Sequence, residues 1–220
     1  MDNQPAGILS LWPTRLLQRV LPGAEPANAA LESLILAEEE SHGGSLTTDY
    51  QAQDFFARSH PVVEWLKTCI NKSVGDYLAA QAINYDVRWS VQGWANINRQ
   101  GDYHNLHNHP HSYLSGTYYV AVPEQSDTGQ HETEQRATGQ RSDLNPGAIS
   151  FYDPRGQVNM NAIAGDGQID PEYRLLPSPG MILLWPSFLM HSVHPNAAEA
   201  PRISISFNIL LNRDAHQLPG

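Results

Sequence analysis

The sequence contains little cysteine, little basic charge and no long apolar run. Cys69 is the one cysteine in 220 residues, so the chain cannot form an internal disulfide, and a buried thiol in a reducing compartment is expected. With 13 basic against 23 acidic residues, the formal net charge of −10 repels a phosphate backbone and argues against nucleic acid as a partner. No stretch reaches the roughly 18 apolar residues that span a membrane, and the start of the chain lacks the basic flank and apolar stretch of a signal peptide. We therefore expect a soluble, cytoplasmic protein that binds neither membranes nor nucleic acids.

Length and composition favour one domain over residues 1–220. The residues are 40% hydrophobic, and 200 or more residues of mainly β structure often form one unit. Residues 1–85 carry helical patterns and are expected to form a helical support region, whereas residues 86–211 carry strand patterns. Within the second region, residues 123–146 are polar and predict a mobile insertion. Residues 155–179 are also expected to form a loop, with enough apolar side chains to pack over the mouth of a cavity.

Two segments in the first third of the chain predict amphipathic helices. From Asn28 to about Glu40, apolar residues recur at helical spacing, with Asn28 as the expected N-terminal cap. Between Val62 and about Ala82, apolar residues repeat every three or four positions and form one buried stripe. Both helices are expected to pack against a sheet.

From Val87 onward the apolar period changes to two, which predicts β-strands. The strand-like segments are VRWSV, WANIN, SYLSGTYYVAV, GAISFYD, GMILLWPS and RISISFNILLN. No helical spacers separate them, so a mostly antiparallel sheet or barrel is favoured. In the last segment the isoleucines share one face, while Arg202, Ser204 and Ser206 share the other. This polar face is either solvated or turned toward a functional feature.

Four of the ten histidines lie within eight positions of one segment, YHNLHNHPHSYLSG. His107 and His109 are two positions apart, so on an extended chain both side chains leave the same face, close enough to bind one ion. A third ligand has to come from elsewhere, and His191, just beyond the apolar strand GMILLW, is the best candidate. Imidazole nitrogen suits iron, zinc, copper and nickel, and three ligands on one side leave the opposite positions open. The expected site is a metal centre with an open face; polar surface or hydrogen-bonded histidines are the alternative.

Other histidines compete for these positions. His104 lies an odd number of positions from His107, so on a regular strand it faces the other way, although a bulge would change this. His111 follows a proline at an expected bend. His194 competes with His191 but lies in an expected turn. We therefore expect His104 and His111 beside the metal ligands or at the surface.

Arg202 and Ser204 form a candidate binding site for a carboxylate. A planar guanidinium binds a carboxylate through two parallel hydrogen bonds, and a hydroxyl two residues further on can add a third. Taken alone, an arginine at a strand start is most often in a surface ion pair. Together with the histidine pattern, the Arg-x-Ser pair instead predicts recognition of a dicarboxylate.

These motifs resemble the iron(II)- and 2-oxoglutarate-dependent dioxygenases, and within them a family of 2-oxoglutarate oxygenases of bacteria and phages. The resemblance is carried by HNHPHSYLSGTYYV, FYDPR, PSFLMHSVHPN and RISISFNI, over roughly residues 86–211. It implies a double-stranded β-helix, a cupin-like jelly roll of mainly β structure with N-terminal helices supporting one sheet. It also implies that iron(II), 2-oxoglutarate and O2 are used to hydroxylate a small-molecule or amino-acid-type substrate.

The resemblance assigns metal-binding and catalytic roles to three residues, His107, His109 and His191. Arg202 and Ser204 match the Arg-x-Ser pair that binds the far carboxylate of 2-oxoglutarate. The segment NINRQGDYHNLHNH resembles the Asn-x-Tyr-x-x-Gly pattern of the nucleic-acid-repair branch, which implies that Asn96 and Asn98 contact the cosubstrate. It does not carry over that branch's substrate, since the acidic charge argues against DNA.

His109 departs from the superfamily pattern, which has Asp or Glu at this position. A third imidazole leaves an iron centre more positive than a carboxylate does. Asp153, in FYDPR, is an alternative source of a carboxylate ligand. The departure keeps two other functions open: a three-histidine cupin-type enzyme that does not use 2-oxoglutarate, either a dioxygenase or a zinc hydrolase, and a jelly roll that binds a small ligand without catalysis. The exposed edges of a jelly roll also favour a homodimer.

Overall fold

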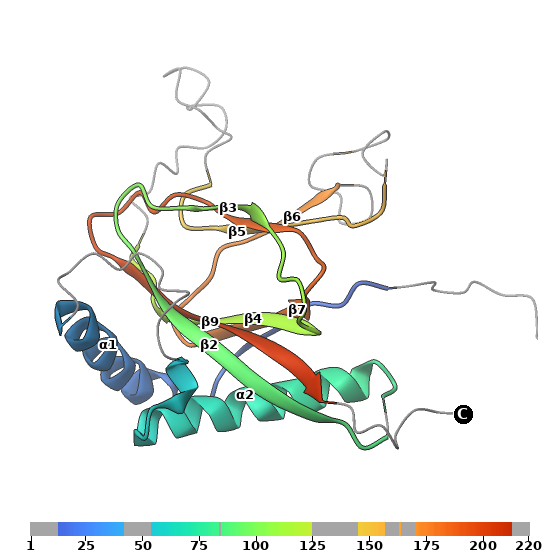
Figure 1. The fold of residues 1–220 in the computed structure, drawn as a ribbon. Helices are drawn as coiled ribbons and strands as arrows, with labels where there is room; N and C mark the ends of the chain where they lie inside the picture. The colour runs from blue at the N-terminus through green and yellow to red at the C-terminus, as the bar shows by residue number, and fades with distance from the viewer. Residues whose placement is uncertain are drawn as a thin grey trace, which may run out of the picture.

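The computed structural model describes residues 13–41, 54–83, 85–124, 145–156, 163 and 170–212. In these residues two antiparallel β-sheets face each other, and two helices, α1 (Ala24–Ser41) and α2 (Pro61–Ala80), lie against the outer side of one sheet (Figure 1). No helix in the described ranges is long and apolar enough to cross a membrane. The arrangement confirms the predicted double-stranded β-helix with N-terminal supporting helices.

Each sheet combines strands from distant parts of the chain. In the described residues the larger sheet has five strands, in the order β1 (Leu17–Val20), β7 (Met181–Pro186), β4 (Leu114–Ala121), β9 (Arg202–Asn212) and β2 (Arg88–Asn98). The smaller sheet has four, in the order β3 (His104–His107), β8 (His191–Val193), β5 (Ile149–Tyr152) and β6 (Glu172–Leu175). Because β9 lies between β2 and β4, Asn96 and Tyr119 flank Ser204 across the sheet.

A polar contact lies near the start of each helix, and the two contacts differ in kind. α2 begins at Pro61, with His60 as N-cap, and the His60 side chain accepts a hydrogen bond from the Val62 backbone N–H at 3.2 Å. α1 begins before Asn28, so the predicted capping role of Asn28 is wrong. The Oδ1 atom of Asn28 instead accepts a hydrogen bond from the Tyr118 hydroxyl at 2.6 Å, which joins the helix to the sheet.

The main apolar core lies between the helices and the larger sheet. It contains Leu31 of α1, Leu66 and Ile70 of α2, and Ile205 and Phe207 of β9, all of them almost fully buried. Fully burying one such side chain contributes about 1.5–3 kcal/mol. The apolar face predicted for the last strand is therefore the face that the helices cover.

A second core lies between the two sheets. It joins Leu183 of β7 to Phe151 of β5 and Val193 of β8. On the same side of the larger sheet, Arg202 and Ser204 of β9 line a cavity. The space between the sheets is therefore apolar in one part and polar in the other, and the predicted polar face of β9 points into the polar part.

Four short strands were not predicted from the sequence: β1, β3, β6 and β8. Each has three or four residues and at most two apolar ones, so neither an alternating pattern nor an apolar run could be recognised. β6 falls within residues 155–179, so the expected loop is wrong over Glu172–Leu175. Of the predicted mobile insertion at 123–146, residues 125–144 lie outside the described residues.

Gly116 and Gly75 form a matched pair for measuring how tightly β4 is packed. A Cβ atom at Gly116 would lie 2.4 Å from the ring of Phe207 and 2.6 Å from the backbone oxygen of Leu183. We expect Gly116→Ala to lower the free energy of unfolding by about 1–3 kcal/mol, because neither neighbour can move freely. A Cβ atom at Gly75, inside α2, would have nothing within 4 Å. Gly75→Ala should therefore raise the free energy of unfolding by about 0.5–1 kcal/mol, because alanine favours a helix more than glycine does. Urea unfolding measures both, and a stable Gly116→Ala variant contradicts the packing described for β4.

Candidate active site

His107 and His191 face each other across two neighbouring strands. β3 pairs with β8 so that His107 lies opposite His191, and the centroids of the two rings are 4.3 Å apart. His191 begins β8 and is 3% exposed. Strand pairing therefore brings together two histidines that are far apart in the sequence.

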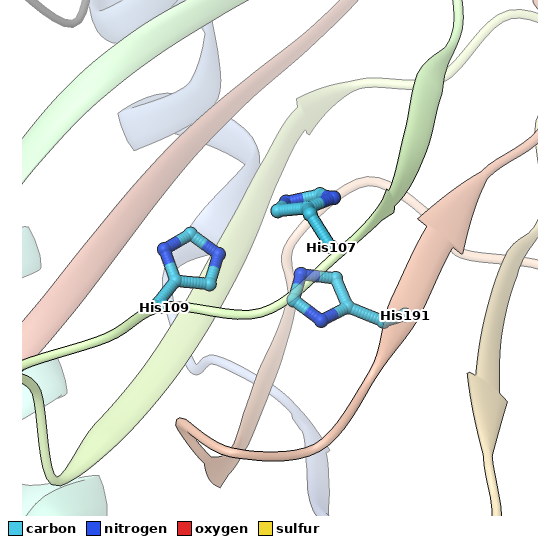
Figure 2. A group of neighbouring side chains, drawn as sticks. All are labelled: His107, His109 and His191. Atoms are coloured by element: carbon cyan, nitrogen blue, oxygen red, sulfur yellow. The ribbon is translucent and has the colours of Figure 1, made fainter.

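His109 completes a group of three imidazoles (Figure 2). It follows the end of β3, and its backbone N–H donates a hydrogen bond to the Ser187 carbonyl oxygen at 3.0 Å. Its ring centroid lies 5.1 Å from that of His107 and 5.2 Å from that of His191. One ligand nitrogen of each residue lies within 4.8 Å of the other two. Imidazole nitrogen binds zinc at about 2.0–2.1 Å, so the three residues are close enough together to bind one ion.

The hydrogen bonds of these rings leave lone pairs available for a metal. Nδ1 of His107 lies 2.6 Å from the Asn105 carbonyl oxygen, and Nδ1 of His191 lies 2.9 Å from that of Leu189. Because a carbonyl oxygen only accepts, each Nδ1 carries the proton and each Nε2 carries a lone pair. Burial lowers the pKa of His191 to about 3 and the pKa of His109 to about 4. Both rings are therefore neutral near pH 7, which is the form that binds metals.

Three residues that competed for ligand positions, His194, His111 and Asp153, are not part of this group. Nε2 of His194 is 2.7 Å from the Ser150 hydroxyl, and His111 is exposed, with a left-handed backbone at φ 68°. Asp153 accepts hydrogen bonds from the Arg155 guanidinium, at 2.9 Å from Nε and 2.5 Å from Nη2. Among the residues that the structure describes, the group of three imidazoles includes no carboxylate.

Arg202 lines the same cavity and is 2% exposed. Its Nη2 donates a hydrogen bond to Asn98 Oδ1 at 2.9 Å, and its Nη1 donates to the Gly147 carbonyl oxygen at 3.3 Å. Within the described part of the chain, Nε of Arg202 has no hydrogen-bond partner and no acidic residue lines the cavity. Burial lowers the pKa of Arg202, yet a guanidinium remains protonated. A buried cation without an anion is unfavourable, so the site suits a ligand carboxylate.

Hydroxyl groups and aromatic rings form much of the remaining cavity wall. Ser204, Thr117 and Tyr119 line it, and burial raises the pKa of Tyr119 to about 12, so the phenol stays protonated. Trp185 packs edge-on against His191, with ring centroids 4.9 Å apart. Its Nε1 is, in the described residues, the second buried donor without a partner. Two such donors on one cavity fit a ligand rich in acceptor oxygens, as 2-oxoglutarate is.

Asn96 and Asn98 lie behind the cavity wall. Both are fully buried, and neither is among the residues that line the cavity. Nδ2 of Asn96 donates a hydrogen bond to the Ser206 hydroxyl at 2.9 Å, while Asn98 bonds to Arg202. Both asparagines thus contact residues of the cavity wall, and their direct contact with a cosubstrate stays a prediction.

His104 lines the cavity beside the group of three imidazoles, although on a regular strand it would face the other way. The register of β3 on β8 shifts between His104 and His107, as it does at a β-bulge, and the shift lets both side chains face inward. Nε2 of His104 lies 3.1 Å from Nδ2 of Asn98. Burial, and then the charge of Arg202, lower the pKa of His104 to about 4. Only the possibility of a bulge pointed to this placement in the sequence.

Comparison with known proteins gives one family match. A protein-family model described as "Putative 2OG-Fe(II) oxygenase" matches residues 92–208, more than half of the chain. The matched range includes all three clustered histidines and Arg202. No curated protein matches the sequence.

Several solved structures resemble this one. A prolyl-4-hydroxylase of Pseudomonas putida has a TM-score of 0.57 and 11% identity, over 90% of this chain and 93% of that one. A prolyl hydroxylase of Trichoplax adhaerens, in complex with a peptide fragment of the hypoxia inducible factor oxygen degradation domain, has a TM-score of 0.57 and 13% identity, over 89% and 83%. HygX of Streptomyces hygroscopicus, with nickel and 2-oxoglutarate bound, has a TM-score of 0.53 and 15% identity, over 89% and 82%. At these identities the likeness shows the fold.

Proposed function

Because this chain belongs to the 2OG-Fe(II) oxygenase family, whose model matches more than half of it, we propose which of its residues bind iron(II) and 2-oxoglutarate. His107, His109 and His191 bind the iron(II) ion. Arg202 and Ser204 bind the far carboxylate of 2-oxoglutarate. One observation carries the proposal: a single cavity is lined by three clustered imidazoles and by a buried guanidinium that has an unpartnered Nε.

As a member of this family, the protein is an oxygenase that uses iron(II), 2-oxoglutarate and O2. When bound by the imidazoles, iron(II) would supply the redox chemistry by which O2 converts 2-oxoglutarate to succinate and carbon dioxide and hydroxylates a substrate carbon. The residues of the chain hold and orient the reactants. Three imidazole ligands would leave other coordination positions of the ion to 2-oxoglutarate and O2.

Arg202 orients 2-oxoglutarate by charge and by shape. A guanidinium offers parallel N–H donors to the two oxygens of a carboxylate, and its charge is weakly screened where water is excluded. The hydroxyls of Ser204 and Tyr119, which neighbour each other across β9 and β4, can donate to the same carboxylate. With one end of the cosubstrate held in this way, its keto acid end is directed toward the three imidazoles.

The buried guanidinium in this cavity favours the proposed function over a three-histidine enzyme that does not use 2-oxoglutarate, and the family match favours it over a jelly roll that only binds a ligand. A three-histidine enzyme that does not use 2-oxoglutarate has no need of a buried guanidinium on its cavity wall, and burying one is unfavourable unless an anion binds it. A jelly roll that only binds a ligand is not supported, because the family match is to oxygenases. The absence of a carboxylate from the imidazole group, in the described residues, affects the charge of the metal centre and leaves the cosubstrate site intact.

The proposal extends to the setting of the enzyme. It acts as a single domain over residues 1–220 in the cytoplasm, as a homodimer, on a small-molecule or amino-acid-type substrate. The likeness to two prolyl hydroxylases supports an amino-acid-type substrate. The formal net charge of −10 supports the exclusion of nucleic acid, because a phosphate backbone would be repelled.

Succinate formation tests the proposal. Purified protein supplied with iron(II), 2-oxoglutarate and O2 is expected to release succinate, and leaving out either iron(II) or 2-oxoglutarate should abolish the release. Zinc in place of iron should preserve 2-oxoglutarate binding, measured by calorimetry, and give no succinate. Iron-loaded protein that neither binds 2-oxoglutarate nor releases succinate contradicts the proposal, and metal binding without 2-oxoglutarate binding supports the three-histidine alternative.

A further inference from the structure

Hydrogen bonds link His104 to Arg202 through Asn98. Asn98 Oδ1 accepts from Arg202 Nη2 at 2.9 Å, and Asn98 Nδ2 lies 3.1 Å from His104 Nε2. A guanidinium only donates, so the oxygen of the Asn98 amide faces Arg202 and its nitrogen faces His104. His104 Nε2 must then accept, and the proton of the His104 ring lies on Nδ1. The chemistry of Arg202 thus sets the direction of both bonds.

The backbone around Asn98 leaves its amide little freedom. Asn98 lies opposite Arg202 in the pairing of β2 with β9, and its carbonyl oxygen accepts a hydrogen bond from Asn196 Nδ2 at 3.0 Å. Asn98 and Asn196 are both almost fully buried. Rotation about the terminal bond of the Asn98 side chain therefore remains as the main way to change the contact with Arg202. His104 opposes that rotation, because it accepts only from the amide nitrogen.

The strand that carries His104 also reaches the metal group. The register shift between His104 and His107 places both on the cavity wall, with ring centroids 6.3 Å apart. β3 therefore contributes one imidazole, His107, to the candidate metal centre and a second, His104, to the hydrogen bonds that lead to Arg202. The four residues of β3 thus include one proposed metal ligand and one residue that is linked to Arg202.

We propose that His104 is a positioning residue for the cosubstrate, which acts through Asn98 to hold the Arg202 guanidinium in the orientation that binds the far carboxylate of 2-oxoglutarate. The inference rests on the proposed function and deepens it. It gives a fourth histidine a part in selectivity, that is, in the preference of the site for a keto acid with a second carboxylate over one without. Without an acceptor at position 104, the Asn98 amide loses one of the two bonds that keep its oxygen toward Arg202. A rotated amide would place N–H donors against a guanidinium that also only donates.

Binding to zinc-loaded protein tests this inference without turnover. The two probes are 2-oxoglutarate and 2-oxobutyrate, which has the keto acid end but no far carboxylate. His104→Leu is expected to weaken 2-oxoglutarate binding about tenfold, the effect of losing one buried hydrogen bond, and to leave 2-oxobutyrate and zinc affinities unchanged. His104→Gln retains an acceptor oxygen and should stay within about threefold of the unmodified protein. Calorimetry measures all three affinities.

Control variants separate positioning from a loss of structure. Leu106→Gln changes a 54% exposed side chain on the same strand and should leave both keto acid affinities unchanged. If His104→Leu does not fold, Asn98→Ala interrupts the same contacts and must give the same selective loss. In the His104→Leu, Asn98→Ala double variant the loss should not exceed that of Asn98→Ala alone, because the two residues act in series.

Three results overturn the role of His104. These are an equal loss for both keto acids in His104→Leu, a loss of zinc affinity in that variant, and a His104→Gln variant as weak as His104→Leu. Failure of the unmodified, zinc-loaded protein to bind 2-oxoglutarate overturns the proposed function itself. The two failures are distinguishable because the second is measured before any substitution is made.

Discussion

His191→Ala is expected to abolish succinate formation and to lower metal affinity by more than about 100-fold, since altering even the residues that support a metal ligand costs 10–100-fold. His191 supplies one of three nitrogens that lie within 4.8 Å of one another, and no other described histidine or acidic residue belongs to that group. His194 does not replace it, because its Nε2 is bonded to the Ser150 hydroxyl. Elemental analysis after dialysis measures the bound metal, and succinate release measures turnover.

A surface histidine serves as the control for that variant. His111 is exposed and has φ 68°, a conformation that asparagine adopts readily, so His111→Asn should keep the fold, the metal and the turnover. Near-ultraviolet circular dichroism checks that His191→Ala is folded, because its ring also packs against Trp185 and Phe151. One metal ion per chain in folded His191→Ala contradicts the proposed ligand set.

Local patterns in the sequence predicted the long elements and the short strand β5, and missed the short strands β1, β3, β6 and β8. The eleven residues of β9 alternate for long enough to assign a helix-facing side and a cavity-facing side. The three residues of β8 show no period at all, although they carry His191. Whether so short a segment becomes a strand depends on its partners β3 and β5, which are distant in the sequence. Tertiary pairing, not local propensity, decides such cases.

The residues of the candidate site also fall into those that local patterns predicted and those that depend on strand pairing. The spacing of His107 and His109 was visible locally, and His191 was the best remaining candidate for a third ligand. The resemblance to known oxygenases then gave His191 and Arg202 the same roles as the residue patterns had. The inward turn of His104 depends on a register shift that only the pairing of β3 with β8 produces. Tyr119 and Trp185 were missed for another reason: in a strand of apolar residues, an aromatic side chain that lines a cavity has the same pattern as one that fills a core.

Arg202→Ala is expected to weaken 2-oxoglutarate binding by at least about 100-fold, since each hydrogen bond to a charged group contributes about 1.5–3 kcal/mol and two are lost. Metal content should stay at one ion per chain, because Arg202 is not part of the imidazole group. Arg202→Lys keeps the charge but loses the planar pair of donors, so it should bind 2-oxoglutarate with intermediate affinity. Calorimetry on zinc-loaded protein measures binding, and succinate release from iron-loaded protein measures turnover.

The same variant decides between the two metal-dependent functions. In an enzyme that does not use 2-oxoglutarate, replacement of Arg202 removes a buried cation that nothing in the cavity needs, and oxidation or hydrolysis at the metal should survive it. In a 2-oxoglutarate oxygenase, the replacement removes the anchor of the far carboxylate, and excess 2-oxoglutarate should recover part of the lost succinate formation because the defect lies in binding. Folded, metal-loaded Arg202→Ala with unchanged affinity for 2-oxoglutarate contradicts the proposed anchor. Since Arg202 reaches the cavity from β9 and the imidazoles reach it from β3, β8 and the segment after β3, the loss of one group leaves the other in place.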